Sequence, residues 1–227
     1  MCAGANVVIC GRREPSKPVE ADGRSAVFVK ADIREAAQAQ KVIDQCMAET
    51  GRLDILVNNA GGSPPVEAAT ASPVITDKII QLNLVAPLVL SQMAYSAMSA
   101  TKESANIINI ASVSGARPSP GTAAYGAAKA GLLSATKSLA QEWGPGVRVN
   151  AIIVGLVHHD AGIEHYGGPE GFAKVAQMLP LKRMAEPTDI ADACLYLSSQ
   201  QAAYVSGASL EVDGGGEVPV FLHLADQ

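Results

Sequence analysis

Short apolar runs alternate along the chain with longer segments of helical hydrophobic period. The runs have the length and low charge of strands that are covered on both faces of a parallel sheet. They span Asn6–Cys10, Ala26–Val29, Leu53–Val57, Asn106–Ile110, Arg148–Val154 and Ser209–Val212. The helical patterns between them span Arg34–Thr50, Ile75–Met98, Ala123–Trp143 and Thr188–Ser198. This alternation predicts an α/β fold with a doubly wound parallel sheet and right-handed crossovers.

The length of 227 residues fits one domain over 1–227 better than two. Residues 155–181 are its least regular part, with glycines and a proline around a short helical pattern, and we expect them to form a mobile substrate lid. Ligands of doubly wound sheets bind beyond the carboxyl ends of the strands. The loops after Val57, Ile110 and Val154 are therefore expected to meet at one crevice.

Composition narrows the class of partner. The net charge is −5, aromatic residues make up 4% of the chain, and there is no basic block, which argues against nucleic acid and anionic membranes and for a small molecule. The uncharged stretch between Lys78 and Lys102 is interrupted by Gln, Asn and Pro, so we interpret it as a helix buried against the sheet. The four cysteines have no CxxC spacing and no signal peptide is visible, which predicts a cytoplasmic protein.

Candidate chemistry gathers after the strand that ends at Ile110. Ser112 follows this strand, and Tyr125 comes thirteen residues later on a predicted helix, with Lys129 four residues beyond it. An i, i+4 spacing places Tyr125 and Lys129 on one face of the helix. Such a pair is common on protein surfaces, but the small residues around it, Gly126 among them, allow another element to approach this face closely.

Five motifs in this order resemble the short-chain dehydrogenases/reductases, in the large group that has a YxxxK motif. They are NNAG at 58–61, Asn83 in the uncharged helix, Ser112 followed by YGAAK at 125–129, EWGPGVRVNAI at 142–152, and VDGG at 212–215. The resemblance covers almost the whole chain. It implies a Rossmann-type domain, a nicotinamide cofactor, a small alcohol or ketone substrate, and a homotetramer or dimer.

The resemblance implies a catalytic role for four residues. Tyr125 would be the acid/base of hydride transfer between the cofactor and a secondary alcohol or ketone. A free phenol, with a pKa of about 10, is a weak base at neutral pH, and the Lys129 ammonium would favour the phenolate. Lys129 would also hydrogen-bond the nicotinamide ribose, Ser112 would hold the substrate oxygen, and Asn83 would support a water-linked proton relay through Lys129.

Other positions match the family's cofactor site. Asp32 and its neighbour Ile33 resemble the adenine contact, although Asp32 alone also fits a helix N-cap. The residues matching the adenosine ribose and nicotinamide contacts are Asn59, Ala60, Gly61 and Val157.

The end of the first strand indicates which dinucleotide is bound. Cys10 and Gly11 lack the acid that binds the 2′-hydroxyl of NAD, and Arg12 and Arg13 follow them. Guanidinium groups suit a 2′-phosphate, so we predict NADP, with NAD as the alternative, unless the two arginines only solvate a loop.

Two features depart from the family pattern. His159 stands where the family has a cofactor-binding threonine, and His158, His159, Asp160 and His165 have no recognised zinc spacing, so we expect lid polarity and no metal site. The chain also opens on what resembles the end of the family's first helix. The first strand and the glycine-rich turn are expected to be missing, leaving two unpaired strand edges at the centre of the sheet.

Two functions therefore remain open from the sequence. One is an NADP-dependent oxidoreductase acting on an alcohol or ketone. The other is a non-catalytic, truncated chain that acts only as an interaction partner of intact subunits, through helices Ile75–Met98 and Ala123–Trp143.

Overall fold

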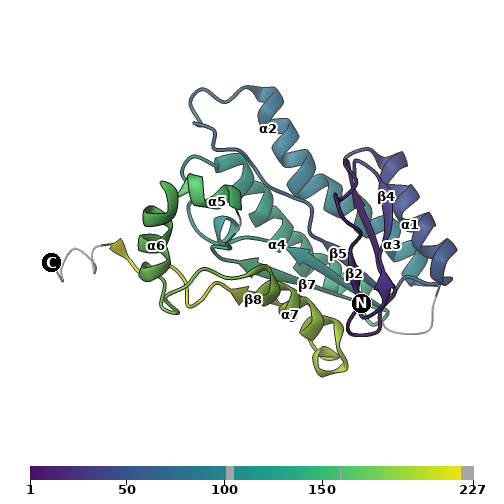
Figure 1. The fold of residues 1–227 in the computed structure, drawn as a ribbon. Coiled ribbons are helices and arrows are strands. Elements are labelled where there is room, and N and C mark those ends of the chain that lie inside the picture. The colour runs from purple at the N-terminus through teal and green to yellow at the C-terminus, as the bar shows by residue number, and fades with distance from the viewer. Residues whose placement is uncertain (101–104, 159, 221–227) are drawn as a thin grey trace.

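The computed structural model describes residues 1–100, 105–158 and 160–220. Its larger sheet is parallel and four-stranded, in the order β5 (Ile55–Asn58), β6 (Ala105–Ile110), β7 (Val147–Val154), β8 (Ser209–Val212). A separate parallel pair joins β1 (Val8–Gly11) to β4 (Val27–Lys30), and a hairpin joins β2 (Glu20–Ala21) to β3 (Arg24–Ser25). Figure 1 shows the helices on either side of the larger sheet.

Local sequence signals mark several of the helix ends. They are α1 (Ala36–Thr50), α2 (Pro73–Ile80), α3 (Ala86–Met98), α4 (Ala123–Trp143), α5 (Asp160–His165), α6 (Gly168–Met178) and α7 (Pro187–Ser198). Gly51 ends α1 in the left-handed conformation, with a φ of 69°, which a glycine adopts without strain. The side chain of Ser72 caps the start of α2, and Pro187 opens α7.

Alternate residues of the central strands face opposite layers of helices. Ile107 and Val149 pack in one apolar cluster with residues of α1 and α3, while Ile108 and Ile152 pack in another with Leu197 of α7. Each central strand is thus covered on both faces, which is the reason for its continuous apolar run. The predicted doubly wound α/β fold is confirmed.

The uncharged segment forms one continuous helical stretch that changes its winding in the middle. Residues Gln81–Val85 form a π-helical turn between α2 and α3. Within the described residues, Pro73–Met98 is the helical stretch that is long and apolar enough to cross a membrane by length and composition. Leu90, Ala94 and Met98 are nevertheless buried in the main apolar cluster, so α3 packs against the sheet, as predicted.

Three parts of the structure add to or differ from the sequence predictions. The β2–β3 hairpin was not predicted, although Asp22 and Gly23, both with positive φ, are a standard hairpin turn signal. Residues 155–181 hold two helices, α5 and α6, where the pattern indicated one short helix. No ladder joins β1 to β5 within the described chain, so the two unpaired edges expected at this point are present.

Candidate active site

Close packing of a turn on a helix brings Ser112 to Tyr125. Ser112 ends the loop after β6 and accepts a hydrogen bond from the backbone N–H of Ser114, at the start of a short 3₁₀ turn. A Cβ at Gly115 in this turn would lie 2.7 Å from the carbonyl carbon of Lys129, and one at Gly126 in α4 would lie 2.8 Å from the carbonyl oxygen of Ser114. Only glycine allows this approach from both sides.

Tyr125 is half-buried and lies beside the side chain of Ser112. Burial raises the pKa of the Tyr125 phenol, and the neighbouring Ser112 hydroxyl offsets part of that rise. Lys129 lies one helical turn further on, with its Nζ 5.6 Å from the centre of the Tyr125 ring. The structure thus brings Ser112, Tyr125 and Lys129 together, as their positions in the sequence predict.

Lys129 is a buried cation, with only 3% of its surface exposed. Its Nζ donates a hydrogen bond of 2.7 Å to the carbonyl oxygen of Ile110, the last residue of β6. Burial lowers the pKa of Lys129 to about 8, because the charged form loses hydration. This group can therefore exchange its proton near physiological pH.

Asn83 lies in the π-helical turn and is fully buried. Its Oδ1 accepts from the backbone N–H of Gly62 at 2.9 Å, and its Nδ2 donates to the carbonyl oxygens of Gly62 and Ile79, each at 2.9 Å. A Cβ at Gly61 would lie 2.7 Å from Asn83 Oδ1 and 3.2 Å from Lys129 Nζ. Asn83 thus fixes the loop after β5 beside the ammonium of Lys129.

The residues predicted to contact the adenosine end of the cofactor lie just after strands β1 and β4. Arg12 and Arg13 are exposed directly after β1. Asp32 follows β4, and its pKa is lowered to about 2, chiefly by a hydrogen bond from the Arg34 side chain and to a smaller extent by the charge of Arg12. Ile33 beside it is 9% exposed.

The N-cap interpretation of Asp32 is wrong, because α1 begins at Ala36 and its N-cap residue is Glu35. Asp32 Oδ1 instead accepts from the backbone N–H of Arg34 at 3.1 Å, in a turn before the helix.

The remaining predicted contacts lie in two loops. Asn59, Ala60 and Gly61 are exposed after β5. Val157 lies near the start of residues 155–181, and its backbone pairs with that of Ala185.

Of the three histidines within residues 155–181, the structure describes the side chain of one. His158 Nδ1 lies 3.1 Å from Glu186 Oε1, and its ring packs on Phe172. His159 lies outside the described residues, as do the side chains of Asp160 and His165.

A buried network of amides and hydroxyls was not assigned a role from the sequence. Asn58 Nδ2 donates to Asn109 Oδ1 at 2.8 Å and to Ser91 Oγ at 2.9 Å, and Asn109 Nδ2 donates to Thr136 Oγ1 at 2.9 Å. The network links β5 and β6 to helices α3 and α4. Its sequence signal was two asparagines at neighbouring positions of otherwise apolar strands, where an unpaired amide would be costly.

These residues suit both ends of a nicotinamide dinucleotide. Lys129 Nζ uses one of its three N–H donors on Ile110, which leaves two for the hydroxyls of a ribose. Arg12 and Arg13 offer guanidinium groups for a phosphate, and the charge of Arg12 acts on the acidic Asp32. The donors present therefore fit a bound dinucleotide cofactor.

Comparison with known proteins shows the same architecture in enzymes of different specificity. A putative ketoacyl reductase 2 of granaticin polyketide synthase from Streptomyces violaceoruber is 34% identical, over 95% of this chain and 87% of the relative. The structure of aldohexose dehydrogenase from Thermoplasma acidophilum matches with a TM-score of 0.86 and 25% identity, over 93% of this chain and 84% of the other. The structure of 4-hydroxyisoleucine dehydrogenase complexed with NADH matches with a TM-score of 0.77 and 29% identity, over 92% and 86%.

A family profile described as enoyl-(acyl carrier protein) reductase matches residues 2–217. Together with the fold and the relatives, this match shows that the chain belongs to the short-chain dehydrogenase/reductase family of NAD(P)-dependent oxidoreductases.

Proposed function

We propose that this chain transfers hydride between NADP(H) and the carbon of a secondary alcohol or ketone. The observation that carries the proposal is the Ser112–Tyr125–Lys129 arrangement, with a tyrosine beside a serine and a buried ammonium one helical turn away. A bound nicotinamide supplies the hydride chemistry. The chain supplies the proton, the orientation of the substrate and the shielded surroundings.

Each residue has a role that its contacts support. In reduction, Tyr125 gives its proton to the ketone oxygen, and in oxidation it removes the proton of the alcohol. Ser112, which lies beside Tyr125, holds the same substrate oxygen. The positive charge of Lys129 favours the phenolate form that each reduction leaves behind.

Asn83 supports the site indirectly in this proposal. Its side chain is hydrogen-bonded to the backbone of Gly62 and Ile79, so it holds the loop after β5 in place beside Lys129. The water-linked relay through Lys129 remains a prediction.

For the cofactor, we propose NADP over NAD. Arg12 and Arg13 stand at the end of β1, where an acid would be expected for a 2′-hydroxyl. Asp32, Ile33, Asn59, Ala60, Gly61 and Val157 are proposed as further contacts. We also propose a cytoplasmic homotetramer or homodimer acting on a small molecule.

The first test is a titration of the purified chain with NADPH and, separately, with NADH, followed by nicotinamide fluorescence. Saturable binding with NADPH preferred, together with turnover of a ketone that is lost in Tyr125→Phe, is the expected result. Binding of neither dinucleotide would reject the proposal and favour the non-catalytic alternative, an interaction partner of intact subunits. The unpaired edges of β1 and β5 are the observation behind that alternative.

A further inference from the structure

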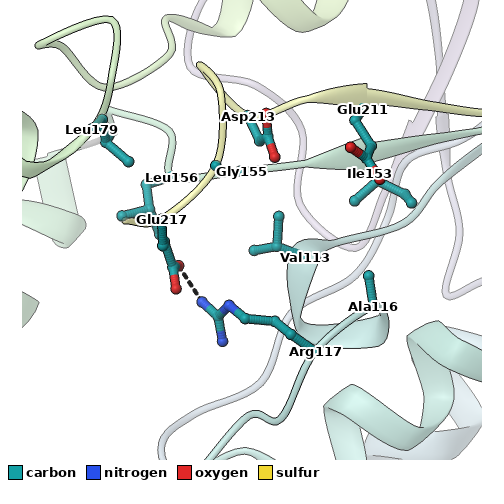
Figure 2. Close-up of a pocket in the computed structure, with 11 residues that line it drawn as sticks. Val113, Ala116, Arg117, Ile153, Gly155, Leu156, Leu179, Glu211, Asp213 and Glu217 are labelled. Carbon is teal, nitrogen blue, oxygen red and sulfur yellow. Dashed lines mark hydrogen bonds and ion pairs between the residues drawn. The ribbon is translucent and has the colours of Figure 1, made fainter. Parts of the chain in front are cut away.

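A cavity of about 210 Å³ opens among the loops that follow β6, β7 and β8. Figure 2 shows it between Val113 from the loop after β6, Gly155 after β7 and Asp213 after β8. Leu156 and Leu179, from the two ends of the 155–181 segment, complete its apolar side. Because Val113 directly follows Ser112 in the chain, one wall of the cavity is the turn that begins at this serine.

The size of the cavity favours a compact substrate. Pockets for drug-sized ligands have volumes of roughly 300–1,000 Å³. A space of about 210 Å³ is below that range, so it suits a short chain or a single ring better than a fused ring system.

Acidic side chains outnumber basic ones around the cavity. Among the described residues that line it, Arg117 carries the positive charge, whereas Glu211, Asp213 and Glu217 are carboxylates. Arg117 is also already engaged: its Nη2 pairs with Glu217, as Figure 2 shows, and its Nη1 donates to the carbonyl oxygen of Pro118 at 2.8 Å. The cavity therefore presents a net negative charge.

An anionic substrate would meet two obstacles in this cavity. An anionic substrate that sought Arg117 would have to displace Glu217, and it would be repelled by Glu211 and Asp213. An uncharged molecule with several hydroxyl groups meets neither obstacle. Its hydroxyls can donate to the carboxylates, and its C–H groups can lie against Val113, Leu156 and Leu179.

We propose that this cavity selects a small, uncharged, hydroxyl-bearing substrate, and that the Arg117–Glu217 ion pair excludes anionic ones. This rests on the proposed dehydrogenase function, since it names the substrate class of the same site. The ion pair joins two loops a hundred residues apart in the sequence, at the exposed rim of the cavity, where each of the two side chains is 39% exposed.

The test compares two probes that differ mainly in charge, glucitol and gluconate. Their binding to the protein without dinucleotide is measured by saturation-transfer NMR at pH 7. We expect the wild-type chain to bind glucitol about tenfold more tightly than gluconate. Glu217→Gln should release Arg117 and tighten gluconate binding by about five- to tenfold, while Arg117→Gln should weaken it further.

Two more variants complete the test. Glu142→Gln, on the exposed end of α4, removes the same charge outside the cavity and should leave both affinities unchanged. Glu211→Gln keeps the ion pair and should give a smaller gain for gluconate, which supplies a reading even if a change in the pair disturbs folding. Melting curves of each variant establish that it is folded.

The proposal is overturned if neither probe binds, if gluconate binds as tightly as glucitol, or if Glu142→Gln shifts the affinities as Glu217→Gln does. Failure of the proposed function gives a different result. A chain that prefers glucitol but binds neither NADPH nor NADH would reject the dehydrogenase role alone. A chain that binds NADPH but prefers gluconate would reject the substrate class alone.

Discussion

The ammonium of Lys129 donates a 2.7 Å hydrogen bond to the carbonyl oxygen of Ile110, from a position where 3% of the residue is exposed. The last carbonyl of a central strand thus holds a buried cation 5.6 Å from the ring of Tyr125. A charge kept out of water in this way opposes folding. Lys129 is therefore a residue whose effects on activity and on stability can be separated.

Lys129→Met is expected to abolish most activity while leaving the protein as stable at pH 7, or more stable by on the order of 1–2 kcal/mol, because relief of the buried charge outweighs one lost hydrogen bond. The folded-state pKa of about 8 lies below the ordinary value of 10.5. The cost of burying the charge is thus fully present below pH 8 and falls as pH rises from 8 toward 10.5.

The difference in melting temperature between Lys129→Met and wild type should therefore shrink between pH 7 and pH 10. Thermal melts at four pH values measure it. A difference that stays constant over this range would mean that Lys129 does not titrate in the folded protein. Lys137→Met, on the exposed side of the same helix, serves as the matched control.

Tyr125→Phe should reduce kcat for ketone reduction by roughly 10²–10⁴-fold, the usual contribution of a positioned acid/base group. The ring remains, so the affinity for NADPH and the melting temperature should stay close to those of the wild type. Steady-state kinetics with fluorescence titration separate the two effects. If kcat fell less than tenfold, another group would have to donate the proton.

Gly61 and Asn83 are expected to be coupled. Gly61→Ala places a methyl group 2.7 Å from Asn83 Oδ1 and should cost about 1–3 kcal/mol through overpacking. Asn83→Ala removes the obstacle but leaves the backbone groups of Gly62 unpaired, at a cost of about 1–3 kcal/mol.

The double variant Gly61→Ala/Asn83→Ala should lose less stability than the two single changes added together, because the clash is absent once Asn83 is truncated. Urea unfolding of the four proteins gives the interaction energy. Strictly additive losses of stability would show that the loop after β5 moves away, so that the new methyl group does not contact Asn83.

Arg12→Gln/Arg13→Gln should weaken NADPH binding by about ten- to a hundredfold, because a charge-assisted contact to the 2′-phosphate is lost. NADH affinity should be nearly unchanged, since NADH has no such phosphate. Lys41→Gln on the exposed face of α1 tests for a general effect of charge. An equal loss of affinity for both dinucleotides would mean that the arginines lie near a part of the cofactor that NADPH and NADH share.

The elements best predicted from the sequence have strong local signals. Helix α4 (Ala123–Trp143) and strand β8 (Ser209–Val212) have the predicted bounds, because Gly144 and Pro145 end one and an apolar run defines the other. Strand β5 begins two residues later than expected and includes Asn58, whose Nδ2 donates inside the protein to Asn109 and Ser91. A polar residue in a strand is hard to place before its partners are known.

The candidate site, like the fold, could be predicted from the sequence only where local spacing determines it. Ser112, Tyr125 and Lys129 meet because spacing on one helix and one strand end determines where they lie. The Arg117–Glu217 pair depends on the path of the whole chain, since its partners are a hundred residues apart, and neither residue has a local pattern that indicates the other.

The absence of a ladder between β1 and β5 in the described chain has a consequence for hydrogen exchange. Ile55 and Val57 of β5 are exposed, whereas β6 and β7 have strands on both sides and should exchange their amide hydrogens slowest. The edges of β1 and β5 should open first. A ligand that reached from Arg12 to Lys129 would span both sheets, and it would slow exchange at two edges that no backbone ladder connects.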